Sequence, residues 1–242
     1  MILGTIPGAT PDKWVDRWQH RYPSHGLELR HYDDAGQLER IAAGTVDLGY
    51  IRFREGEDQV DRDLCHRVLL YREEPVVCAA AGHWIAAAED SVSVDELAKE
   101  SSLDPKAMIA GSGPADIHSS KAGADLARAE RTALEVVASG AGVVVLPNSV
   151  ARMLSRKDVV IRRIEDSPGF DTGLAWLRDR DDDLIQEFIG IARGRKAGSG
   201  RSQLSAKKAK PEAAPGARSR QRSRLQPRSP RARPPRGRRR PR

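Results

Sequence analysis

The sequence predicts an α/β fold over residues 1–192 and a separate basic tail over residues 193–242. Three observations lead to this expectation. Short apolar or alternating segments, typical of strands, are followed repeatedly by segments with helical spacing. Glycine or proline stands at most of the junctions between them. Charge and composition change sharply near residue 192, where the apolar periodicity also ends.

The first three predicted strands are joined by two predicted helices. The segment MILGTIPG is a short apolar run broken by Pro7 and Gly8. Thr10 followed by Pro11 predicts a helix with Thr10 as N-cap and proline in the first turn. Strands are predicted at 27–33 and 46–53, with a short helix between them that ends at Gly44. Such strands with helical crossovers are expected to pair in parallel.

The rest of the body continues the alternation. Residues 64–81 are expected to be extended on both sides of a break at Glu74–Pro75, because proline interrupts a strand ladder. Ser93 with Glu96 three positions later is a capping box and predicts a helix start. The remaining predicted elements are a strand and turn at 107–113, a helix at 126–140, a strand at 143–147, a helix capped by Asn148, strands at 158–166 and 171–179, and a helix at 181–195.

The stretch VVASGAGVVVLP, residues 136–147, carries Gly140 and Gly142 between a helix and a buried strand. Glycines at this junction let the chain reverse tightly and pack close to the sheet. Pro147 then prevents the ladder from continuing.

This segment resembles the effector-binding domain of LysR-type transcriptional regulators, in which a similar glycine-rich turn and proline recur. LGTIPG at the start, LERIAAGTVDLGYIR at 38–52 and EEPVVCAAAGHWIAAAEDSVSVDELAKE at 73–100 also resemble that family. The resemblance covers about residues 1–192. Because it begins directly after Met1, we expect the chain to lack the family's N-terminal winged helix-turn-helix, and hence not to read DNA through that module.

The resemblance implies a fold like that of type 2 periplasmic binding proteins, with two α/β subdomains and a cleft between them. Subdomain one is expected at about 2–73 and 163–192, and subdomain two at about 74–162. The crossings are then expected near Glu73–Pro75 and Ile161–Arg163. The resemblance also implies a small effector in the cleft and a homodimer or heterodimer formed through this domain.

Strand ends and helix N-termini at such a cleft favour anions, so an anionic effector is the first candidate. The turn at Gly8 and Thr10 is the best anion site, although plain helix capping by Thr10 explains it equally well. Arg52 could bind a carboxylate, or could instead make a surface ion pair. By resemblance, Ser112 and Gly113 form the opposing wall and Thr132 faces the cleft from a helix.

The tail has 19 lysines and arginines against the single acid Glu212, whereas residues 1–192 carry a net charge of −11. With few apolar residues and many prolines, the tail is expected to be disordered. It could bind DNA or RNA nonspecifically, pair with the acidic body, or be the uninformative product of a GC-rich coding region read past its end. The candidate nucleic-acid contacts are Lys207, Lys208, Lys210, Arg238, Arg239 and Arg240.

No catalytic or cofactor motif stands out. Cys65, His66, Cys78 and His83 lack the spacing of a zinc site, and both cysteines are expected to be buried free thiols. Asp181–Asp183 is explained by a helix N-terminus. The GSG at 111–113 lacks the third glycine of a dinucleotide loop, and Ser205 with Lys208 lies in the tail, where no fixed catalytic base can form.

We therefore expect no enzyme, no metal and no cofactor. Two functions remain: an effector-sensing module of a LysR-type regulator whose tail contacts DNA, or a ligand sink or dimerisation partner that modulates full-length regulators. The sequence has no signal peptide and no apolar run long enough to span a membrane, so a cytoplasmic location is expected.

Overall fold

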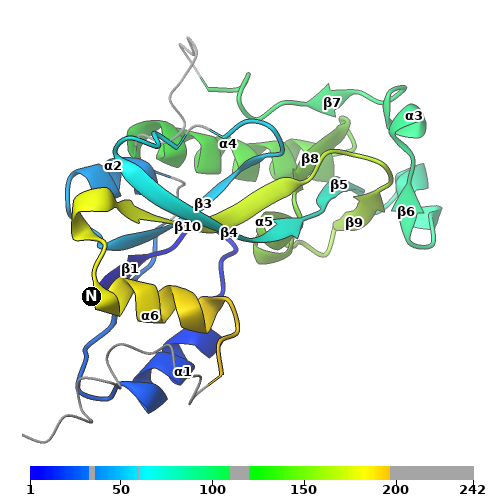
Figure 1. Cartoon of the computed structure of the whole chain (residues 1–242). Helices are drawn as coiled ribbons and strands as arrows, with labels where there is room; N and C mark the ends of the chain where they lie inside the picture. Colours follow the sequence, from blue (N-terminus) through cyan, green and yellow to red (C-terminus); the bar gives the residue numbers. More distant parts are fainter. Residues whose placement is uncertain (33–35, 59, 110–119, 197–242) are drawn as a thin grey trace, which may run out of the picture.

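The computed structural model describes residues 1–32, 36–58, 60–109 and 120–196, and within them the strands form two five-stranded sheets. Figure 1 shows two lobes side by side, with β4 and β10 running between them. Each lobe is a sheet with helices packed on it, which is the α/β architecture predicted. None of the described helices is long and apolar enough to cross a membrane.

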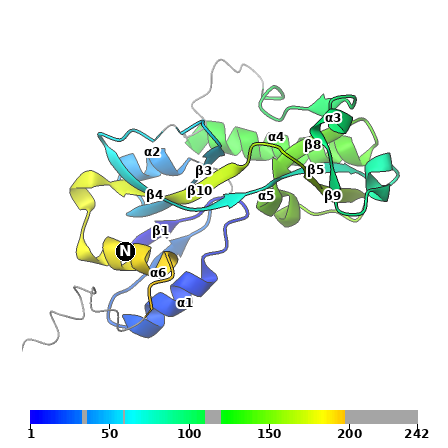
Figure 2. The same ribbon diagram turned by 45° about the vertical axis from the view of Figure 1, so that its right-hand side comes forward.

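The first sheet has the order β2-β1-β3-β10-β4. Strand β1 pairs in parallel with both β2 and β3, as the helical crossovers predict, and β10 is antiparallel to β3 and β4. Helices α1 and α6 lie side by side on one face (Figure 2), and α2 packs against β3 and β10. The elements are β1 (Ile2–Gly4), α1 (Asp12–Arg21), β2 (Glu28–Arg30), α2 (Gln37–Ala42), β3 (Leu48–Arg54), β4 (Cys65–Glu73), β10 (Phe170–Leu177), the 3-10 helix η2 (Arg178–Arg180) and α6 (Asp183–Ala192).

The second sheet has the order β6-β9-β5-β8-β7, with α4 and α5 packed against its central strands. Helix α4 also reaches α2 of the first lobe, so it bridges the two. The elements are β5 (Pro75–Ala80), the 3-10 helix η1 (Trp84–Ala87), β6 (Ser91–Val92), α3 (Val94–Leu97), β7 (Ser102–Leu103), α4 (Ser120–Ala138), β8 (Val143–Pro147), α5 (Asn148–Met153) and β9 (Val159–Ile164).

Both faces of each sheet are covered by apolar clusters. Trp18 and Phe188, which are fully buried, join α1 and α6 to the first sheet. Val137 of α4 and Val150 of α5 join their helices to the second sheet. Cys65 and Cys78 are buried free thiols, as expected, and they lie in different sheets.

Two chain segments connect the lobes. The first, at Glu74 between β4 and β5, lies where the sequence predicts it. The second lies later than the predicted Ile161–Arg163, because β9 remains paired with β5 as far as Arg163. The chain then crosses over residues 165–169 and enters β10.

Several local predictions need correction. Pro11, not Thr10, stands at the N-cap of α1, and no side chain caps this helix. Asn148 is the first residue of α5, where its carbonyl oxygen Oδ1 accepts a hydrogen bond from Arg152 Nε at 3.0 Å, rather than the cap. Residues 107–109 of the strand and turn predicted at 107–113 form a turn and a bend instead, and residues 110–113 lie outside the described residues. The strand of this region is β7, Ser102–Leu103. The capping box of Ser93 and Glu96 is confirmed.

The two glycines before β8 have different roles, and substitutions at them should differ. Gly140 has a φ of 86° and open space around its Cα, so Gly140→Ala should cost about 1 kcal/mol of stability. Gly142 has a φ of 127°, and a Cβ there would lie 2.3 Å from the carbonyl oxygen of Ser101. Gly142→Ala should cost at least about 2 kcal/mol. Urea denaturation of both variants tests this, and equal losses would contradict the close approach.

Candidate functional site

A buried ion pair lies where the two lobes meet. The Arg52 and Glu73 side chains are only 9% and 8% exposed, and Arg52 Nε lies 3.1 Å from Glu73 Oε2. Arg52 reaches this position from β3, and Glu73 is the last residue of β4 before the first crossing. The alternative expected from the sequence was a solvated surface ion pair. The Arg52 side chain is instead enclosed by both lobes.

Three further groups form hydrogen bonds with this ion pair. Arg52 Nη2 donates to the carbonyl oxygen of Pro7 at 3.0 Å and to the Ser149 hydroxyl at 2.8 Å. The backbone N–H of Ser149 donates to Glu73 Oε1. Because Ser149 belongs to α5 of the second lobe, this network joins the lobes through charge-assisted hydrogen bonds.

Gly8 makes a second contact between the lobes. Its φ is 77°, and a Cβ there would lie 2.4 Å from the Ser149 hydroxyl oxygen. Its N–H lies 3.2 Å from the Met153 sulfur of α5. A glycine is therefore needed both for the backbone conformation and for the close approach of α5.

A cavity of about 120 Å³ lies beside this network, between the two sheets. Its walls are partly apolar and come from β3 and β10 of the first lobe and from α4, β8 and α5 of the second. The lining residues are Pro7, Arg52, Phe53, Arg54, Glu57, Asp104, Pro105, Lys106, Leu126, Ala127, Glu130, Val145, Leu146, Pro147, Val150 and Phe170.

Glu130 is the unusual group in this cavity. It is half-buried on α4, and within the described residues its carboxylate has no hydrogen-bond or ion-pair partner. Burial raises its pKa to about 7, and the positive charges of Arg52 and Arg131 act in the opposite direction. A carboxyl group with this pKa in a cavity is a candidate for ligand contact.

The predicted site residues are only partly brought together. Arg52 lines the cavity, but Gly8 instead contacts α5, and Thr10 is exposed outside the cavity. Thr132 is also exposed and lies in another hollow with Met108 and Arg128. Ser112 and Gly113 lie outside the described residues, as do Lys207, Lys208, Lys210, Arg238, Arg239 and Arg240.

Glu73, Ser149 and Glu130 were not among the site residues predicted from the sequence. A signal for Glu130 was present in the spacing of α4, where the buried residues Ala127, Leu134 and Val137 form one helical stripe that Glu130 interrupts. An acid in such a stripe is costly unless it has a partner or a function. No comparable signal exists for Glu73 and Ser149, whose contact depends on how the lobes meet.

Comparisons with known proteins agree with this architecture. Residues 11–197 match the family model of the LysR substrate binding domain. The chain belongs to this family. The resemblance noted in the sequence is therefore confirmed, and with it the periplasmic-binding-protein-like fold. The family is regulatory rather than enzymatic, so this member is a ligand-sensing domain.

Solved structures show the same fold at low identity. The effector binding domain of a BenM variant is 17% identical with a TM-score of 0.59, and the match covers 80% of this chain and 92% of the BenM chain. The BenM domain with its effector benzoate is 16% identical (TM-score 0.57; 86% and 92% covered). The reduced OxyR regulatory domain from Pseudomonas aeruginosa is 19% identical (TM-score 0.54; 80% and 94% covered). No curated protein matches the chain.

Proposed function

We propose that this LysR-type domain senses a small molecule bound in the cavity beside Arg52 and Glu130. The observation that carries the proposal is that this cavity is built from both lobes, so a ligand in it would contact β3 and α4 at once. A ligand that favours one arrangement of the lobes would shift the equilibrium between arrangements, which is how a sensor domain passes on a signal.

Occupancy of the cavity can be tested by filling it. Ala127 is buried and lines the cavity, whereas Thr132, about one turn further along α4, is exposed and lines the other hollow. We would screen small metabolites for a rise in Tm with the full chain and with Ala127→Trp and Thr132→Trp. Hits should lose their effect in Ala127→Trp and keep it in Thr132→Trp.

If the hits lose their effect in Thr132→Trp and keep it in Ala127→Trp, the ligand binds in the hollow beside Thr132. The resemblance to the family implies that Thr132 faces the cleft. Hits that act equally on both variants would bind at neither place. Either result would contradict the proposal.

We propose further that the tail over 193–242 binds nucleic acid without base specificity. Its net charge of +18 supports this, because polybasic segments release counterions from phosphates. CbnR, a structural relative that is 16% identical, has been crystallised with its target DNA, and other relatives are full-length regulators.

Binding to unrelated DNA duplexes should require the tail. The full chain should bind, and its affinity should fall by about 1,000-fold between 50 and 200 mM salt if roughly six phosphates are contacted. A chain ending at Lys196, which keeps the Arg195–Glu187 ion pair at 3.4 Å, should not bind. If neither chain binds, the alternative of a ligand sink or dimerisation partner for full-length regulators is favoured instead.

A further inference from the structure

The charges around the cavity differ between its mouth and its interior. At the mouth, positive and negative groups occur in equal number, and Glu57, Asp104 and Lys106 are exposed. Half-buried Arg54 packs against the ring of Phe170, with its guanidinium carbon 5.3 Å from the ring centroid. The groups at the mouth are Arg54, Lys106, Glu57 and Asp104.

In the interior, Glu130 is the carboxyl group that is left without a partner among the described residues. Arg52 is already paired with Glu73 and donates to Pro7 and Ser149. An incoming carboxylate would have to compete with Glu73 for the same guanidinium, and it would also face Glu130. A ligand with a positive group would meet Glu130, which has no partner among the described residues, and would leave the Arg52 network intact.

We propose that the effector carries a cationic head group, an ammonium or amidinium, that pairs with Glu130, and that its apolar part packs against the walls of the cavity. This rests on the proposed function of the cavity as the effector site. It replaces the anionic effector first expected from the sequence, because Gly8 contacts α5, Thr10 lies outside the cavity, and Arg52 is already paired with Glu73. Apolar walls are available from Phe53, Leu126, Ala127 and Val150.

The pairing should depend on pH. Glu130 must be ionised to pair with a cation, and its pKa of about 7 means that the ionised fraction rises about tenfold between pH 6 and pH 8. Affinity for a permanent cation in this range should rise by the same factor. The other charged groups that face Glu130 or line the cavity are Arg52, Arg54, Glu57, Asp104, Lys106 and Arg131.

Three probes of nearly equal size separate the charge classes: benzylamine, benzyl alcohol and benzoate. We would measure their binding to the full chain by calorimetry at pH 6, 7 and 8, with Glu130→Gln as the test variant. Glu135→Gln is the matched control, because Glu135 is an exposed acid on the same helix and does not line the cavity. Glutamine keeps the shape of the side chain and removes its charge.

Benzylamine should bind best and gain about tenfold in affinity from pH 6 to pH 8. It should lose that gain in Glu130→Gln but not in Glu135→Gln. If benzoate binds best and Glu130→Gln does not weaken benzylamine, the cationic class is wrong while the cavity remains the effector site. If none of the probes binds, and if the metabolites found in the screen raise the Tm of Ala127→Trp as much as that of the wild type, the proposed function fails together with this inference.

Discussion

Replacing Arg52 with methionine is expected to lower the free energy of unfolding by about 3–5 kcal/mol. The reason is that Glu73, only 8% exposed, would be left as a buried charge without its partner. The Pro7 carbonyl and the Ser149 hydroxyl would also lose a donor. Urea denaturation of the two chains measures the difference.

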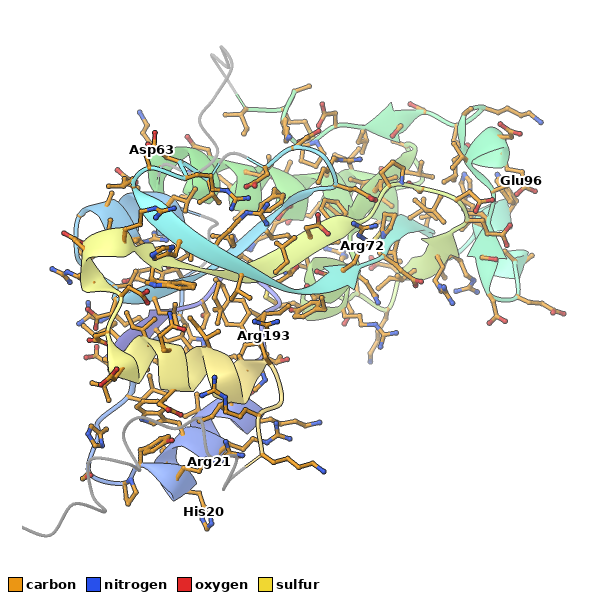
Figure 3. All side chains as sticks on the ribbon, viewed as in Figure 1. His20, Arg21, Asp63, Arg72, Glu96 and Arg193 are labelled. Carbon is orange, nitrogen blue, oxygen red and sulfur yellow. The ribbon has the colours of Figure 1, made fainter. Side chains whose placement is uncertain are left out.

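Arg72 provides the matched control. It lies on the same strand as Glu73, near the middle of the molecule where β4 runs toward β5 (Figure 3), and it pairs with Glu55 at 2.7 Å and Asp171 at 3.1 Å. Because its side chain is 54% exposed, Arg72→Met should cost much less stability than Arg52→Met. In addition, the double variant Arg52→Met/Glu73→Gln should recover much of the loss. Equal costs at Arg52 and Arg72 would show that the buried pair does not hold the lobes.

Glu130 should make the stability of the domain depend on pH. Its pKa is raised in the folded state, so the folded protein binds this proton more tightly than the unfolded chain does. The resulting stabilisation is complete below about pH 4.5 and is lost as pH rises through about 7. The rise in pKa from 4.5 to about 7 corresponds to at most about 3–4 kcal/mol.

The comparison between wild type and Glu130→Gln isolates this contribution. Relative to the variant, wild type should become less stable between about pH 4.5 and pH 7 and then level off. Glu135→Gln, on an exposed position of the same helix, should not show this change. A constant difference between wild type and Glu130→Gln across this range would contradict an enclosed, unpartnered carboxyl group.

The fold could be predicted because its signals are local. Alternating and helical periodicities identify most strands and helices, and Glu74–Pro75 marks the first crossing between the lobes. The position of β7 could not be predicted, because Ser102–Leu103 has only two strand residues and the more apolar residues 107–109 form part of a turn and a bend. A strand of this length forms through its pairing with β8 rather than through its own sequence.

The site was harder to predict because it depends on contacts between segments that are distant in the chain. Arg52 was identified as a candidate, but its partner could be a ligand, a surface acid or Glu73, and only the meeting of β3, β4 and α5 decides among them. Thr132 and Glu130 lie on the same helix, and the apolar spacing alone could have distinguished their faces.

The most direct test of the account is a crystal structure of the protein with the strongest ligand from the metabolite screen. We expect the ligand to lie between β3 and α4, with a cationic group on the Glu130 carboxylate and with the Arg52–Glu73 pair still formed. A ligand bound beside Thr132, or one whose carboxylate displaces Glu73 from Arg52, would contradict this expectation.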